Sequence, residues 1–237
     1  IASVEKKIVS KLGKDTCSVY ISIPFCPSRC SYCSFVSFTS SKLLSLIDDY
    51  MDKLCIDIKQ IFDEIKSLGL TVSTVYIGGG TPTTLDAKQL EKLLNVVNSC
   101  TDTSLLEEFT LEAGRPDTIT AEKLVVIKNG GVTRVSVNPQ TLNPAVLEII
   151  GRHHTVDDFF RAYELVKNSG IKHINTDLIA GLPSEGFRSF SETVDKIIDL
   201  RPDNITVHTL CIKSAADFAN RAGDICNTFS DTTQCVD

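Results

Sequence analysis

Residues 17–33 read CSVYISIPFCPSRCSYC. The first eight of them form a short apolar run, rich in residues that favour β-strands, and a proline ends it. Cys26, Cys30 and Cys33 follow at once with the spacing C-x3-C-x2-C. We therefore predict a strand that leads directly into a loop carrying three thiols.

The rest of the chain repeats the switch from a short apolar run to a longer helical pattern. We predict strands at residues 17–24, 72–77, 109–112, 132–137, 173–179 and 204–210, and helices at residues 43–66, 85–97, 120–127, 144–150, 156–168 and 190–200. Alternating strands and helices indicate βα units and a parallel sheet. Six such strands fit an α/β fold with a partial (β/α)6 TIM-like barrel, or a complete α/β barrel. A doubly wound sheet is the alternative, because spacing alone does not separate the two.

Composition narrows the function classes. The 237 residues are 42% hydrophobic and 23% charged, which is typical of a globular chain with a buried core. The apolar runs are too short to span a bilayer, and we see no signal peptide. The net charge of −6 argues against nucleic acid as the main partner. Nine cysteines without a secretion signal indicate reduced thiols, and hence a cytoplasmic protein.

The cysteine loop has three possible interpretations. Three thiolates at this spacing can hold three irons of a [4Fe–4S] cluster and leave the fourth open to a ligand. A structural zinc ion would need a fourth ligand, such as Cys17 or a histidine. Buried core cysteines are the third possibility. The remaining cysteines lack ligand spacing, and we interpret them as core or incidental thiols: Cys17, Cys55, Cys100, Cys211, Cys226 and Cys235.

C-x3-C-x2-C with Tyr32 before its last cysteine resembles the signature of the radical S-adenosylmethionine (radical SAM) superfamily. YISIPFC at residues 20–26 resembles the oxygen-independent coproporphyrinogen III oxidase family. Further strings are similar to the HemZ-type coproporphyrinogen dehydrogenases of that family: EAGRPD at 112–117, VNPQT at 137–141, GRHHT at 151–155 and NTDLIAGLP at 175–183.

This resemblance implies a domain organisation. It covers roughly residues 17–214, so we expect an N-terminal segment at 1–16 and a radical SAM core domain at 17–214. Residues 215–237 would be a polar, poorly ordered tail at the start of a truncated region. The chain would then be a central catalytic fragment of the family's proteins.

The resemblance also implies the cofactors and their site. A [4Fe–4S] cluster would bind Cys26, Cys30 and Cys33, and S-adenosylmethionine would bind its open iron. The implied cofactor-binding residues are Tyr20, Tyr32, Gly79, Gly80, Thr81, Glu112, Gln140, Arg152 and Asp177. The glycine loop would contact the methionyl amino group, Glu112 the ribose and Arg152 the cofactor carboxylate. Tyr20 would lie near the cluster and substrate, and we also assign it a catalytic role.

The residues taken by themselves leave other interpretations open. The glycine loop at 78–83 can be an ordinary turn after a strand. Glu112 can be solvated or can pair with Arg115, and Asp177 can belong to a buried salt bridge, because a charge within an apolar strand needs a partner. Arg152 can lie on the surface, and Tyr20 can pack in the core.

The implied function is that of an oxidoreductase of haem and porphyrin biosynthesis. It would decarboxylate coproporphyrinogen III to protoporphyrinogen IX without oxygen, through a 5′-deoxyadenosyl radical. The alternative is a haem chaperone, similar to HemW, that binds the cluster and S-adenosylmethionine but transfers haem. Phe35 stands where the decarboxylating oxidases carry a further cysteine, a departure shared by HemZ-like and HemW-like proteins. The implied partners are a porphyrinogen or haem and a low-potential electron donor such as flavodoxin or ferredoxin.

Overall fold

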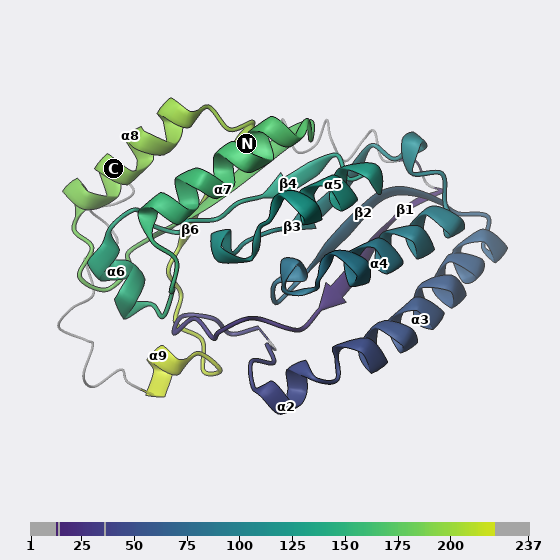
Figure 1. Ribbon diagram of the computed structural model, residues 1–237, viewed down its shortest axis with the longest axis horizontal. Coiled ribbons are helices and arrows are strands. Elements are labelled where there is room, and N and C mark those ends of the chain that lie inside the picture. Colours follow the sequence, from purple (N-terminus) through teal and green to yellow (C-terminus); the bar gives the residue numbers. More distant parts are fainter. Residues whose placement is uncertain (1–12, 14, 36, 221–237) are drawn as a thin grey trace.

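The computed structural model describes residue 13, residues 15–35 and residues 37–220. Within this part of the chain, six strands form one sheet in the order β1-β2-β3-β4-β5-β6, and every neighbouring pair is parallel. The strands, drawn in Figure 1, are β1 (Thr16–Ile23), β2 (Thr71–Gly79), β3 (Glu108–Glu112), β4 (Arg134–Ser136), β5 (His173–Ala180) and β6 (Asn204–Thr209). The predicted alternation of strands and helices is confirmed.

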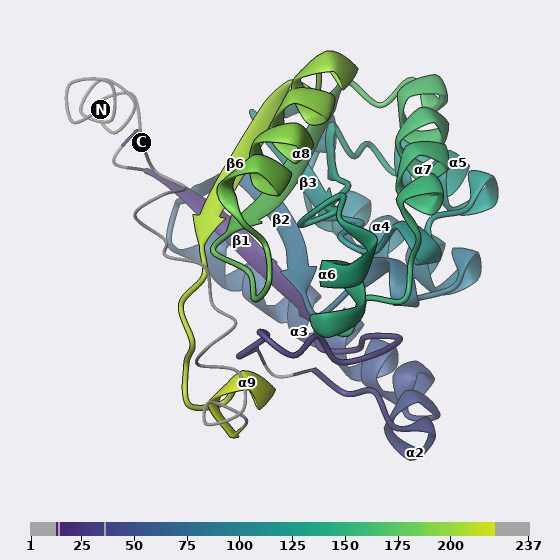
Figure 2. The ribbon, with the colours of Figure 1, turned by 90° about the vertical axis from the view of Figure 1, so that its left-hand side faces the viewer.

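Helices connect successive strands and cover one side of the sheet. They are α2 (Ser41–Leu44), α3 (Ile47–Ser67), α4 (Ala87–Cys100), α5 (Ala121–Asn129), α6 (Pro144–Ile149), α7 (Val156–Ser169) and α8 (Phe187–Leu200). A short helix, α9 (Asp217–Asn220), follows β6. Short 3-10 turns lie at Pro82–Thr84, Thr103–Leu105 and Pro116–Thr118. Helices α3, α4, α5 and α7 pack against one another in chain order, and Figure 2 shows them on one side of the sheet.

The strand order decides between the two predicted architectures. A doubly wound sheet reverses its strand order at a switch point, whereas here the spatial order follows the chain throughout. Among the described residues, β1 and β6 are the two edges of the sheet and do not pair with each other. The fold is therefore an open, partial α/β barrel, and the doubly wound alternative is wrong.

The two faces of the sheet differ in polarity because side chains alternate along each strand. On β3, Phe109 and Leu111 are fully buried in the apolar core that the helices cover. Between and beside them, Glu108, Thr110 and Glu112 line a cavity on the opposite face. Apolar burial stabilises the helical side, and the polar side is left to carry a site.

Local signals placed most helix ends correctly. Thr120, the first residue of the predicted helix, caps α5 by accepting a hydrogen bond from the backbone nitrogen of Lys123 at 3.3 Å. The single helix expected over 43–66 is instead divided into α2 and α3 at Ser45 and Leu46. The Ser45 hydroxyl donates to the Lys42 carbonyl at 2.9 Å, a local hydrogen bond that competes with a continuous helix.

The first residues of the predicted tail, up to residue 220, include a short helix. Residues 217–220 form α9, and the Phe218 side chain is fully buried among apolar residues of α6 and β5. The buried Phe218 ring, its backbone hydrogen bond to Ser31 and the ion pair between Asp217 and Arg29 hold this segment. Residues 221–237, with Cys226 and Cys235, and most of residues 1–16 lie outside the described part.

None of the helices that the structure describes has a stretch long and apolar enough to cross a lipid bilayer.

Candidate functional site

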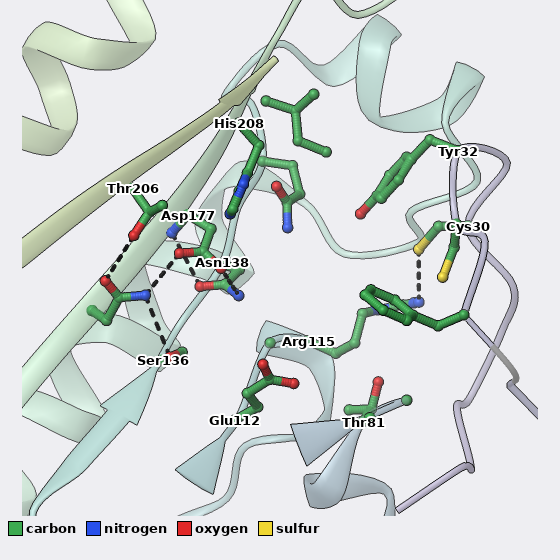
Figure 3. Close-up of a pocket in the computed structure, with 18 of the residues that line it drawn as sticks. Cys30, Tyr32, Thr81, Glu112, Arg115, Ser136, Asn138, Asp177, Thr206 and His208 are labelled. Carbon is green, nitrogen blue, oxygen red and sulfur yellow. Dashed lines mark hydrogen bonds between the residues drawn. The ribbon is translucent and has the colours of Figure 1, made fainter. Parts of the chain in front are cut away.

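A cavity of about 920 Å³ opens at the carboxyl ends of the strands, on the polar face of the sheet. In barrels built from βα units, loops at this end carry the functional groups. Every predicted site residue except Tyr20 lines this cavity: Cys26, Cys30, Tyr32, Cys33, Gly79, Gly80, Thr81, Glu112, Gln140, Arg152 and Asp177. Figure 3 shows how several of these side chains converge. The fold thus brings distant motifs together, and the role of each residue stays a prediction.

Backbone hydrogen bonds fasten the cysteine loop on both sides. The Cys26 nitrogen donates to the Phe38 carbonyl at 3.1 Å, and the Ser31 nitrogen donates to the Ile150 carbonyl at 3.0 Å. The Phe218 nitrogen donates to the Ser31 carbonyl at 2.9 Å, so α9 also holds the loop. The loop is therefore fixed by segments from far along the chain.

Burial controls the protonation of the thiols. It raises the pKa of both Cys26 and Cys33, so these thiols keep their protons when no metal is bound. Iron binding requires thiolates and would displace those protons. Cys26 and Cys30 are buried, and all three cysteines also line the cavity, an arrangement that favours ligands over residues that serve only to fill the core.

The arrangement argues against a structural zinc site. Within the described ranges, no three Cys, His, Asp or Glu side chains converge as ligands of a single metal ion would. Structural zinc gathers four ligands around one point, whereas the thiolates of an iron–sulfur cluster bind separate irons. Cys17, the fourth ligand considered for zinc, lies near the start of β1, and Cys26 follows the end of that strand.

The glycine loop is pressed against the cysteine loop. The Gly80 nitrogen donates to the Ile23 carbonyl at 2.8 Å, and the Thr81 hydroxyl lies 3.3 Å from the Cys26 sulfur. A Cβ atom at Gly80 would come within 2.9 Å of that sulfur and 2.7 Å of the Phe25 carbonyl oxygen. Only glycine permits this approach, so the loop is more than an ordinary turn.

Glu112 and Asp177 face the cavity with neutral partners. The Tyr76 hydroxyl donates to Glu112, whose pKa is raised by burial and by the nearby charge of Asp177. Asp177 accepts hydrogen bonds from Asn138 at 2.9 Å and from Asn175 at 2.7 Å. No cation pairs with either carboxylate among the residues described. The interpretation of Asp177 as part of a buried salt bridge, and of Glu112 as the partner of Arg115, is therefore wrong.

Arg152 is buried rather than on the surface, with 7% of its area exposed. One terminal nitrogen donates to the Gly114 and Asn138 carbonyls at 2.8 and 2.7 Å, and the other donates to the Tyr32 hydroxyl at 3.1 Å. Its Nε atom and the Gln140 Oε1 atom have no partner among the described residues. A buried donor without a partner is costly, so the site fits a ligand that carries a carboxylate, as S-adenosylmethionine does.

Tyr20 lies outside the cavity lining but beside it. Its ring stacks on Tyr76 with a centroid distance of 5.7 Å and an interplanar angle of 13°. The side chain is 61% exposed, so the interpretation as core packing is wrong. Tyr76 links this ring to the cavity because it lines the cavity and contacts Glu112.

Several lining residues were not predicted from the sequence. They include Phe35, Tyr76, Arg115, Asn138, Asn175, His208 and Cys211. Strand alternation could have found Asn175, which stands two residues before Asp177 on β5 and so shares its face. Asn138 lies beyond the end of β4, where strand alternation gives no signal. Cys211, interpreted as a core or incidental thiol, is exposed and lines the same cavity.

His154 is a buried histidine just after Arg152. It is 3% exposed, and neither ring nitrogen has a partner among the described residues. Burial and the charge of Arg152 lower its pKa to about 4. The ring is therefore neutral in the folded protein at neutral pH, and protonation opposes folding.

This predicts an acid-sensitive contribution to stability. In the unfolded chain, His154 binds a proton below its ordinary pKa of 6.5. In the folded chain, it stays neutral until the pH falls to about 4. Stability should fall by about 2–3 kcal/mol across that window from this residue. Urea unfolding of the iron-free chain between pH 4.5 and 7.5 measures it. His154→Gln should flatten the slope, whereas His153→Gln, at an exposed neighbour, should not. An unchanged slope in His154→Gln would contradict the assignment.

Comparison with known proteins places this geometry in context. The chain is 40% identical over 205 residues to the oxygen-independent coproporphyrinogen-III oxidase-like protein HemZ of Bacillus subtilis, covering 86% of this chain and 41% of HemZ. It is 35% identical over 204 residues to the haem chaperone HemW of Lactococcus lactis, covering 86% of this chain and 52% of HemW. The chain thus spans about half, or less, of the length of these relatives.

A solved structure shares the fold. The coproporphyrinogen III oxidase HemN of Escherichia coli, described as a radical SAM enzyme, aligns with a TM-score of 0.80 and 24% identity. The alignment covers 99% of this chain and 53% of HemN. Residues 20–197 match the Radical SAM superfamily, whose proteins bind a [4Fe–4S] cluster and S-adenosylmethionine. The chain, with its three-cysteine loop at the mouth of an open parallel barrel, belongs to the radical SAM superfamily.

Proposed function

We propose that this chain carries the radical-generating core of an oxidoreductase that converts coproporphyrinogen III to protoporphyrinogen IX. The main support is the arrangement of the cavity, where the three-cysteine loop and a set of polar side chains meet. The similarity to HemZ, at 40% identity, supports a porphyrinogen as the substrate. A radical mechanism suits this reaction because the propionate β-carbon offers no acidic hydrogen.

In this proposal, the three cysteines would bind the iron–sulfur cluster, and other cavity residues would bind S-adenosylmethionine. Cys26, Cys30 and Cys33 would hold three irons of the cluster, and the unpartnered Nε–H of Arg152 would bind the carboxylate of S-adenosylmethionine. Glu112 would accept hydrogen bonds from ribose hydroxyls. When bound, the cluster and S-adenosylmethionine would supply a carbon radical that takes a hydrogen atom from the propionate. The propionate would then lose carbon dioxide and one electron to become a vinyl group, and that electron balances the one spent on cleaving S-adenosylmethionine. The protein's own task is to orient these groups and to exclude water.

The cavity extends beyond the cysteine loop. Ser136, Asn175, Thr206 and His208 line its side along β4, β5 and β6. At about 920 Å³ it lies near the upper end of the usual size for a small-molecule site. We propose that this far side receives the reacting part of the tetrapyrrole.

The second candidate function is haem transfer. It is supported by the HemW relatives and by Phe35, a 68% exposed ring that lines the cavity in place of a further cysteine. An exposed apolar ring can contact a flat macrocycle.

The proposed partners and location follow from the same chemistry. Cluster reduction requires a low-potential electron donor, such as a flavodoxin or ferredoxin. The described cysteines are all free thiols, which supports a reducing compartment, the cytoplasm.

The proposal is tested by an anaerobic turnover assay. The reconstituted, reduced chain is given S-adenosylmethionine and coproporphyrinogen III, and 5′-deoxyadenosine and protoporphyrinogen IX are measured by mass spectrometry. We expect both products, with loss of both in Cys30→Ala and retention in Cys100→Ala, a cysteine far from the cavity. Transfer of haem to an acceptor protein without a vinyl product would replace the proposal with the chaperone function. A loaded cluster without any 5′-deoxyadenosine would contradict it.

A second prediction concerns the glycine loop. Gly80→Ala places a Cβ atom against Cys26 and the Phe25 carbonyl, and this should displace the cysteine loop. We expect the iron bound per chain after reconstitution to fall several-fold. Gly186→Ala is the matched control, because a Cβ atom there meets nothing within 4 Å and its φ is −81°. Equal iron content in Gly80→Ala and wild type would show that the two loops need not touch.

A further inference from the structure

Arg115 is a buried cation that reaches the cysteine loop from the segment after β3. Arg115 has only 2% of its surface exposed to solvent. One terminal nitrogen approaches the Cys30 sulfur at 3.7 Å and the Ser28 carbonyl at 3.4 Å, and the other donates to the Ser28 hydroxyl at 3.0 Å. Figure 3 shows the guanidinium directed at Cys30. The side chain therefore contacts both the backbone of the loop and one of its thiols.

The local backbone places this side chain. Arg115 precedes Pro116 and adopts an extended conformation, with φ −121° and ψ 107°. A residue before proline is driven away from helical angles, so the sequence Arg-Pro at the end of β3 favours this geometry. The guanidinium is held by residues of two separate segments and has little freedom to turn away from the sulfur.

The charge of Arg115 is only partly compensated. Among the described residues, its carboxylate partner is Asp117, at 3.3 Å, whose side chain is 30% exposed to solvent. A guanidinium stays protonated throughout the accessible pH range. Its positive charge therefore remains close to the Cys30 sulfur, in a part of the protein where water screens it weakly.

If Arg115 only supported the cysteine loop, its guanidinium would not need to contact the Cys30 sulfur. The Ser28 carbonyl and hydroxyl already tie the guanidinium to the loop, whereas the contact with the sulfur acts on the ligand atom itself. Arg152 also carries charge near Cys30 and interacts with it, but its hydrogen bonds to Tyr32, Gly114 and Asn138 use most of its donors, whereas Arg115 directs a terminal nitrogen at the Cys30 sulfur. Hydrogen bonds and positive charge at ligand sulfurs stabilise the reduced state of an iron–sulfur cluster.

We propose that Arg115 is a positioning residue that raises the reduction potential of the cluster held by Cys30. It does so through its hydrogen bond to the sulfur and through its charge. Because it makes the reduced state easier to reach, it would let a cellular electron donor start the reaction. This inference rests on the cluster site of the proposed function.

The test is a redox titration of the reconstituted chain, followed by electron paramagnetic resonance. Arg115→Met replaces the arginine by an uncharged side chain of similar length that has no hydrogen-bond donor. Arg115→Lys keeps the positive charge but loses the planar guanidinium with its paired N–H donors. At a fixed solution potential, we expect the ratio of reduced to oxidised cluster to fall about tenfold in Arg115→Met, which is about 59 mV for one electron. In Arg115→Lys this ratio should fall by a smaller factor. Arg188→Met, at a 93% exposed side chain, is the matched control and should not shift.

Iron and sulfide content separates the two possible failures. If wild type binds no cluster, the proposed function fails and this inference fails with it. If Arg115→Met binds a full cluster at the wild-type potential, Arg115 only supports the loop and the inference is wrong. If Arg115→Met loses iron, the comparison of Arg115→Lys with Ser28→Ala decides. Ser28→Ala removes a hydrogen bond between Arg115 and the loop but leaves the contact with the sulfur. If the reduction potential of the cluster shifts in Arg115→Lys and not in Ser28→Ala, the proposal is supported. If the two variants have the same potential, the proposal is overturned.

Discussion

The parallel pairing of β1 with β2 is the constraint on which the site depends. Its register sets Ile23 opposite Gly79, so the two strands end together and their following loops must lie against each other. The Thr81 nitrogen then donates to the Phe25 carbonyl at 2.8 Å, and the glycine backbone approaches Cys26 more closely than any side chain would allow. A shift of this register by one residue would turn every side chain to the opposite face. The cysteine loop and the glycine loop are thus parts of a single structure.

The same sheet sorts the remaining groups by face. Apolar residues on one face pack against the helices, and carboxylates, amides and hydroxyls on the other face meet in the cavity. Burying Glu112 and Asp177 is tolerated because tyrosine and asparagine side chains donate to them. These neutral donors use only part of the acceptor capacity of the two carboxylates, so oxygen atoms remain free to accept hydrogen bonds from a ligand. The unpartnered Nε of Arg152 adds a donor beside them.

The sequence predicted the strands and their alternation with helices, because apolar periodicity and βα order are local signals. The predicted residues of the cavity wall came from the family resemblance, and others such as Tyr76 and Asn138 were not predicted. The sequence also favoured a barrel, which the strand order confirms. Contacts between distant segments could not be read in this way. Nothing in the spacing of Arg115 indicates that it meets Cys30, and nothing near Phe218 indicates the apolar pocket that holds it. The sequence also did not show that β1 is an edge strand of the sheet, and so it did not show that Tyr20 would be exposed beside Tyr76.

The central claim is that Cys26, Cys30 and Cys33 hold a cluster with one iron open to S-adenosylmethionine. The electron paramagnetic resonance spectrum of the reduced, reconstituted chain tests it most directly when recorded before and after S-adenosylmethionine is added. If the cofactor binds the open iron, the g values of the cluster signal should change, and Arg152→Met should require more cofactor for the same change. A reduced cluster whose spectrum is the same with saturating S-adenosylmethionine would contradict the account.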